Sequence, residues 1–242
     1  RMKTKISFVG LGKLGLPLAT NLAKKRFLVE AIDLNQKTIK TLQRGNAPWV
    51  ETDLQSNIDL AEDNITYTTK YDNAHKSDVS IILVNTPTNK KDGSFSNIYV
   101  EQSLISLCNN FVENGKKSHH FILSSTVMPR SIKDTFIPLI ESITGWTLNK
   151  EFGFSYVPDF VAIGKIIYDF ESLLLLKVPF ICDVSSMKKS YEFSLCLSTT
   201  ALSDWHLPTL FDDNCRPDSS KWLILSIFLI PNLLFLLRGI TG

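Results

Sequence analysis

Residues 5–19 read KISFVGLGKLGLPLA, and this stretch decides the fold of the first part of the chain. A short apolar run, Ile6–Val9, leads directly into Gly10-Leu-Gly-Lys-Leu-Gly15, which matches the pattern G-x-G-x-x-G. A helical stretch then begins near Leu14. The glycine pattern alone is weak, but a strand before it and a helix after it are the context of a dinucleotide-binding βαβ unit.

Each glycine of this turn has a physical reason. Gly10 permits the tight turn, Gly12 lets the backbone approach a pyrophosphate, and Gly15 lets the helix pack close to the strand. The start of the helix adds free N–H groups and a positive dipole end for the phosphates. We therefore expect the whole turn to contact the cofactor, namely Gly10, Leu11, Gly12, Lys13, Leu14 and Gly15.

An acidic residue follows at the distance that this unit requires. Asp33 closes the next apolar run, 21 positions after Gly12, and the expected separation is about 20 residues. Its carboxylate can accept hydrogen bonds from the adenosine ribose and would repel a 2′-phosphate, so the sequence predicts NAD rather than NADP. The alternative at this stage is a glycine turn that binds no ligand.

The rhythm of the first 171 residues is that of an α/β protein. Helical stretches at Leu16–Lys25 and Gln36–Arg44 separate the earlier strand-like runs. The strand-like runs are Ile6–Val9, Val29–Ile32, Val79–Val84, Phe121–Ser124 and Phe154–Val157. Short apolar strands alternating with helices predict a Rossmann-type doubly wound parallel sheet over residues 1–171.

Residues 172–242 break this rhythm and are left unassigned. They are rich in Leu and Ser, and no helical or strand period holds for long. The apolar run from Trp222 to Leu237 is interrupted by Pro231 and is shorter than the ~20 residues that a spanning helix usually needs. It fits a tail anchor, a core helix or a segment never selected to fold, and the abrupt change suggests that residues from about 172 onward are a frame-shifted translation.

Composition narrows the class of protein. A formal net charge of +2 points neither to nucleic acid nor to an anionic membrane surface. The cysteines Cys108, Cys182, Cys196 and Cys215 form no C-x-x-C pair, so we expect neither a metal site nor a disulfide framework. The first glycine turn comes too early for a signal peptide, so we expect a cytoplasmic protein.

Five segments after the turn resemble, in order, the NAD-binding half of the UDP-glucose/GDP-mannose dehydrogenase family. The match is incomplete at three places: Thr52 and Asp53 replace a Pro-Gly pair, Arg130, directly after Pro129, replaces a glycine, and Asp159 replaces a glutamate. The segments are Glu51-Thr-Asp-Leu54, Val84-Asn-Thr86-Pro87-Thr, Asp92-Gly93 with Tyr99-Val-Glu101, Ser124-Ser125-Thr126-Val-Met-Pro129 and Tyr156-Val-Pro158-Asp159-Phe160. The shared opening leaves β-hydroxyacid dehydrogenases as a rival, although that family lacks the last segment.

The resemblance implies an activity and site residues. Family enzymes oxidise the C6 alcohol of a nucleotide sugar to a carboxylate with NAD, using a cysteine nucleophile, and so supply polysaccharide precursors. They are usually homo-oligomers. By resemblance, Thr86, Pro87, Ser125 and Thr126 contact the cofactor, and Thr126 and Asp159 take part in catalysis.

The resemblance stops near residue 171, before the family's cysteine segment. The chain therefore looks truncated, and two readings from different classes stay open. It is part of a nucleotide-sugar dehydrogenase, or it is a non-catalytic NAD-binding remnant. A membrane-tethered form, anchored by Trp222–Leu237, is the third and least favoured alternative.

Overall fold

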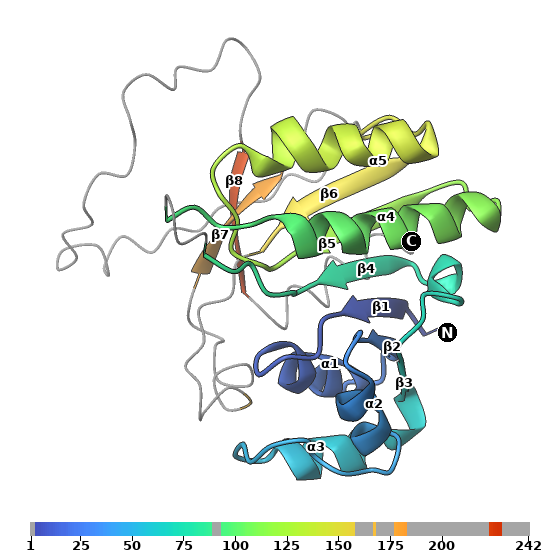
Figure 1. Ribbon diagram of the computed structural model, residues 1–242, viewed down its shortest axis with the longest axis vertical. Helices are drawn as coiled ribbons and strands as arrows, with labels where there is room; N and C mark the ends of the chain where they lie inside the picture. Colours follow the sequence, from blue (N-terminus) through green and yellow to red (C-terminus); the bar gives the residue numbers. More distant parts are fainter. Residues whose placement is uncertain (1–2, 89–92, 158–166, 168–176, 183–222, 229–242) are drawn as a thin grey trace, which may run out of the picture.

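The computed structural model describes residues 3–88, 93–157, 167, 177–182 and 223–228, the last two ranges by their backbone alone. One eight-stranded sheet runs through this part of the chain in the order β3-β2-β1-β4-β5-β6-β7-β8 (Figure 1). The strands are β1 Lys5–Val9, β2 Leu28–Ile32, β3 Ile65–Thr68, β4 Val79–Ile82, β5 His119–Leu123, β6 Phe152–Tyr156, β7 Lys177–Cys182 and β8 Leu223–Phe228. All pairs from β3 to β6 are parallel, so the predicted Rossmann-type sheet is confirmed.

Among the described residues, five α-helices with defined bounds connect the strands. They are α1 Gly15–Lys24, α2 Gln36–Leu42, α3 Leu54–Ala61, α4 Ile98–Glu113 and α5 Ile137–Thr144. Short turns of 3₁₀-helix lie at Glu62–Asn64 and Ala74–Lys76, and a π-helical turn, Ile132–Phe136, leads into α5. No helix in the described ranges is both long and apolar enough to cross a membrane.

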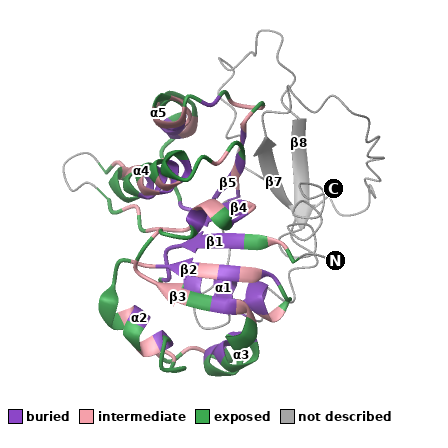
Figure 2. Cartoon of the chain, turned by 90° about the vertical axis from the view of Figure 1, so that its right-hand side faces the viewer, coloured by how far each residue is buried: buried purple, intermediate pink, exposed green. Residues whose placement is uncertain are grey.

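Helices cover both faces of the sheet, and successive side chains of each strand point to opposite faces. Ile6 and Phe8 of β1 and Ile122 of β5 pack with the helices α1, α2 and α3. Phe121 and Leu123 of β5 belong to the other core, with the helices α4 and α5. In Figure 2 much of the length of the central strands has the colour of buried residues.

Several elements differ from the sequence expectations. β3, α3, α4 and α5 were not predicted. β3 is a four-residue run, Ile-Thr-Tyr-Thr, and only its first residue is buried, so its hydrophobic signal is weak. β5 and β6 each begin two residues earlier than predicted, at His119 and Phe152. The expected strands missed these starts because two histidines and a glycine interrupt the apolar pattern.

Two strands come from the part of the chain left unassigned. β7 pairs antiparallel with β6 and with β8, so the sheet continues beyond residue 171. β8 lies inside the apolar run Trp222–Leu237, which was considered as a helix or an anchor. A short apolar stretch of about four to eight residues, such as β8, fits a buried strand as well as a segment of a buried helix. The other residues of that run lie outside the described ranges, and the division at residues 171 and 172 stays a prediction.

Candidate functional site

The first glycine of the turn cannot carry a side chain. Gly10 has φ +100°, a conformation that L-residues rarely adopt. A Cβ atom there would lie 2.1 Å from the carbonyl oxygen of Leu83, just beyond β4. The Gly10 N–H donates to the Ile32 carbonyl at 2.9 Å. The turn is therefore wedged between the ends of β2 and β4, in contact with both backbones.

The last glycine of the motif is fixed by a second close approach. A Cβ atom on Gly15 would lie 2.0 Å from the Gly10 carbonyl oxygen and 3.3 Å from the Phe8 ring. α1 consequently starts in contact with the end of β1, which is the packing role expected of this glycine.

Gly12 differs from both, because within the described ranges no atom beyond its two chain neighbours lies within 4 Å of the place a Cβ would occupy. Its surroundings within the chain would accept a side chain. The missing Cβ leaves the exposed backbone uncovered directly before α1, where a group from outside can touch it.

The N-terminus of α1 next to this exposed backbone is uncapped. Leu14 occupies the N-cap position and makes no side-chain hydrogen bond there, and the first turn carries no acidic residue. The start of a helix is the positive end of its dipole. In the first turn of α1, the Leu16 N–H donates to the Gly12 carbonyl at 3.1 Å, and Pro17 has no N–H. Gly12 and Lys13 are exposed beside this helix start. The combination suits a phosphate anion.

Asp33 ties the turn to the end of β2. One oxygen of its carboxylate accepts from the Leu11 N–H at 2.7 Å, and the other accepts from the Asn35 N–H at 2.8 Å. A carboxylate has about four acceptor positions, so two remain for hydroxyl donors. Asp33 is held beside the glycine turn, where the sequence predicted a ribose-binding carboxylate.

The loops after β4 and β5 are joined by Ser125. Its hydroxyl donates to the Val84 carbonyl at 2.8 Å and accepts from the Val84 N–H at 2.9 Å. Thr86 is half-buried in the first loop, and Thr126 is exposed in the second. The hydroxyl of Ser125, expected to meet the cofactor, is thus engaged with the backbone of the neighbouring loop.

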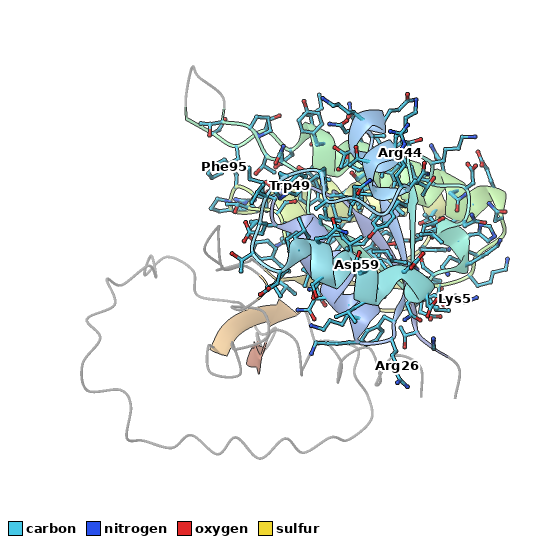
Figure 3. All side chains as sticks on the ribbon, turned by 90° about the horizontal axis from the view of Figure 1, so that it is seen from below. Lys5, Arg26, Arg44, Trp49, Asp59 and Phe95 are labelled. Atoms are coloured by element: carbon cyan, nitrogen blue, oxygen red, sulfur yellow. The ribbon has the colours of Figure 1, made fainter. Side chains whose placement is uncertain are left out.

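These groups all lie where parallel strands end. Asp33 follows β2, the glycine turn follows β1, and the loops of Thr86 and Thr126 follow β4 and β5. In open α/β sheets ligands bind outside the carboxyl ends of the strands, where the strand order reverses, and here that point lies between β1 and β4. In Figure 3, Phe95 of the β4–α4 loop and Lys5 at the start of β1 lie on opposite sides of the molecule.

The structure adds one residue that the sequence did not point to. Burial raises the pKa of Tyr71, its hydrogen bond with Ser103 lowers it, and the charge of Asp33 raises it again. Tyr71 therefore lies near the carboxylate of the predicted ribose site. It follows β3, the strand that was missed, so its place at this edge was hidden. Asp159, the other predicted catalytic residue, lies outside the described residues.

The comparisons with known proteins identify the family of this domain. The profile described as "UDP-glucose/GDP-mannose dehydrogenase family, NAD binding domain" matches residues 4–173. A GDP-mannose 6-dehydrogenase of Pseudomonas putida is 30% identical over 173 residues, covering 69% of this chain and 38% of that protein. The chain thus spans well under half the length of this curated relative.

Two solved structures share the fold of this part of the chain. A ternary complex of GDP-mannose dehydrogenase from Pseudomonas aeruginosa matches with a TM-score of 0.64 and 29% identity, over 68% of this chain and 38% of that one. A UDP-N-acetyl-mannosamine dehydrogenase from S. aureus matches with a TM-score of 0.63 and 32% identity, over 69% and 39%.

Proposed function

Since the chain belongs to the UDP-glucose/GDP-mannose dehydrogenase family and carries its NAD-binding domain, we propose that it is the cofactor-binding part of an NAD-dependent nucleotide-sugar 6-dehydrogenase. The reaction is the oxidation of the C6 alcohol of a nucleotide sugar to a carboxylate. The relatives named above act on different nucleotide sugars according to their names, so the proposal is confined to this substrate class.

The observation that carries the proposal is the open space at Gly12. Gly10 and Gly15 are explained by contacts within the protein, since a Cβ on either would overlap a backbone oxygen. Gly12 has no such contact. A ligand that approaches the backbone there explains all three glycines together, and the pyrophosphate of a dinucleotide is the group that this approach suits.

The residues present fit NAD at each step along the turn. The positive end of the α1 dipole and the backbone of the glycine turn would face the pyrophosphate, with the exposed Lys13 adding a positive charge. Asp33 would accept from the adenosine ribose hydroxyls, and its negative charge disfavours the 2′-phosphate of NADP.

The remaining half of the cofactor would extend towards Thr86, Pro87 and Thr126. When bound, NAD supplies the hydride acceptor for the oxidation. On the protein side, the exposed Thr126 hydroxyl is available to orient a polar group or a water there. We carry over the catalytic role of Asp159 from the family resemblance alone.

Equilibrium binding to the full chain tests the proposal. We expect the chain to bind NAD with a dissociation constant of about 1 mM or lower, and NADP at least about tenfold more weakly. A folded chain that binds neither, or that prefers NADP, would contradict it. Incubation of the same sample with NAD and a panel of UDP- and GDP-sugars, monitored by NADH absorbance, tests whether this chain turns over a substrate by itself.

A further inference from the structure

We propose that Ser125 is a positioning residue for the nicotinamide half of NAD and acts through Val84, with Ser131 as a second anchor of the same loop. The inference rests on the proposed cofactor site. It differs from the expectation that Ser125 touches the cofactor, because it assigns the hydroxyl to the framework around the pocket. The two serines join loops that follow different strands and that would otherwise be set independently.

The Ser125 hydroxyl links the two loops through two hydrogen bonds. Ser125 is 2% exposed, and its hydroxyl bonds to both backbone groups of Val84, 41 residues earlier in the chain. A serine hydroxyl has one donor and two acceptor positions, so the donor is fully used. An alanine at this position would leave the Val84 N–H and carbonyl without this partner.

The link starts where the sheet stops. The parallel ladder continues as far as Leu83, whose N–H donates to the Val9 carbonyl at 2.8 Å, and Ser124, whose N–H donates to Ile82 at 2.8 Å. At the next residue of each segment, Val84 and Ser125, hydrogen bonds to the Ser125 side chain replace the backbone pairing. Ser125 therefore extends the β4–β5 connection by one step, into the two loops that carry Thr86 and Thr126.

Ser131 anchors the other end of the β5–α5 loop. Its hydroxyl oxygen accepts from the Asn97 side-chain amide at 2.9 Å, and Ser131 is 7% exposed. Asn97 is the N-cap residue of α4. Residues 126–130 are thus an arch whose two ends are bonded to the segment 84–97.

The part between the anchors faces outwards. Thr126, Met128 and Arg130 are exposed, while Ser125 and Ser131 are buried. Arg130 has φ +72° and its Nε lies 2.8 Å from the Asp134 carboxylate, which holds the far side of the arch. The two hydrogen bonds between Ser125 and Val84 would therefore fix the position of Thr126 relative to the loop that carries Thr86.

The strand order indicates which half of the cofactor the hydrogen bonds of Ser125 and Ser131 would position. The glycine turn and Asp33 belong to β1 and β2, which receive the pyrophosphate and the adenosine end. β4 and β5 lie across the reversal point, so the other end of the dinucleotide falls over their loops. A disturbance at Ser125 should affect the nicotinamide end and leave the adenosine end intact.

Two ligands separate the effects in the full chain. NAD reports on both halves of the site, whereas ADP-ribose lacks the nicotinamide. We expect Ser125→Ala to weaken NAD binding about tenfold and to change ADP-ribose binding by less than about twofold. The matched control is Ser80→Ala, which removes another buried serine hydroxyl of a β4–β5 contact, 2.8 Å from His119 Nε2, at the opposite end of the strands. It should leave the ratio of the two affinities unchanged.

Equal weakening of both ligands by Ser125→Ala, or no weakening of either, would overturn the positioning role. Ser131→Ala provides a second measurement, independent of whether Ser125→Ala folds. It should give the same selective loss of NAD affinity to a smaller extent, and equal effects on both ligands would again count against the arch. An unmodified chain that binds neither ligand contradicts the proposed function itself, which distinguishes the two failures.

Discussion

The carboxylate of Asp33 accepts a hydrogen bond of 2.7 Å from the backbone N–H of Leu11, in the middle of the glycine turn. The same carboxylate also accepts from the Asn35 N–H at 2.8 Å. The residue predicted to recognise the ribose therefore also holds the turn expected to receive the pyrophosphate. Ribose recognition and the contact with the turn both depend on the negative charge of Asp33, since hydrogen bonds to an ionised acceptor are stronger than neutral ones.

Replacement of this carboxylate tests the double role. Asp33→Asn keeps the shape but replaces one acceptor oxygen by an N–H₂ group, which would face a backbone N–H. We expect the free energy of unfolding to fall by about 1–3 kcal/mol, and NAD affinity to fall at least about tenfold with a smaller preference over NADP. Denaturant titration and equilibrium binding measure these effects. Asp63→Asn, at an exposed position beyond α3, is the control and should change neither.

Gly10 and Gly15 should be intolerant of any side chain, for reasons within the fold. An alanine at Gly10 combines φ +100° with a contact of 2.1 Å to the Leu83 carbonyl oxygen, and at Gly15 the overlap is 2.0 Å with the Gly10 carbonyl oxygen. We expect each substitution to destabilise the chain by about 3 kcal/mol or more. Thermal or urea unfolding checks this. Variants as stable as the parent would show that the turn is built differently.

Gly153 is a third position that leaves no room for a side chain, because it lies against the imidazole ring of His120. A Cβ atom on Gly153 of β6 would lie 2.2 Å from His120 Nδ1, and His120 Nε2 lies 2.8 Å from Ser155 Oγ. Gly153→Ala should cost about 1–3 kcal/mol of stability because it displaces this imidazole. In a double-mutant cycle, His120→Ala should remove most of the effect of Gly153→Ala. Simple additivity of the two losses would contradict the predicted overlap.

Two neighbouring histidines, His119 buried and His120 half-buried, predict loss of stability in mild acid. Burial, followed by the charges of Lys116 and His120, holds the pKa of His119 well below its ordinary value, and burial lowers the pKa of His120 to about 4. The unfolded chain takes up protons near pH 6.5 and the folded chain does so only at lower pH. The stabilisation is therefore complete above about pH 6.5 and is lost as the pH falls towards 4.

Urea unfolding at several pH values measures this dependence. Each histidine contributes a slope of up to about 1.4 kcal/mol per pH unit. His120→Gln removes one titrating group, so its free energy of unfolding should depend less steeply on pH over this range. An unchanged slope would show that His120 is not the source.

The parts of the fold predictable from sequence are those whose signals are local. The strand, glycine turn and helix from Ile6 to Lys24 and the acid at position 33 lie within one βαβ unit, and each residue constrains its neighbour. α4 was missed although its buried residues, including Val100, Leu104, Leu107 and Phe111, recur at helical spacing.

Other features depend on pairings between distant segments. The hydroxyl of Ser125 meets Val84 only because β4 and β5 are adjacent and parallel in one register. His119 and His120 begin β5 because Ser80 and Ser155 on the neighbouring strands accept or donate to them across the sheet. Neither relationship leaves a pattern in the sequence of a single segment.

The most direct test of the account is Gly12→Ala, studied by unfolding and by NAD binding on the same sample. Because, in the part of the chain that the structure describes, no atom beyond the chain neighbours of Gly12 lies within 4 Å of the added Cβ, the free energy of unfolding should stay within about 0.5 kcal/mol of the parent. NAD affinity should fall at least about tenfold, because the methyl group would stand where the pyrophosphate is proposed to approach the backbone. A folded Gly12→Ala chain that binds NAD as tightly as the parent would contradict the central claim that the cofactor sits on this turn.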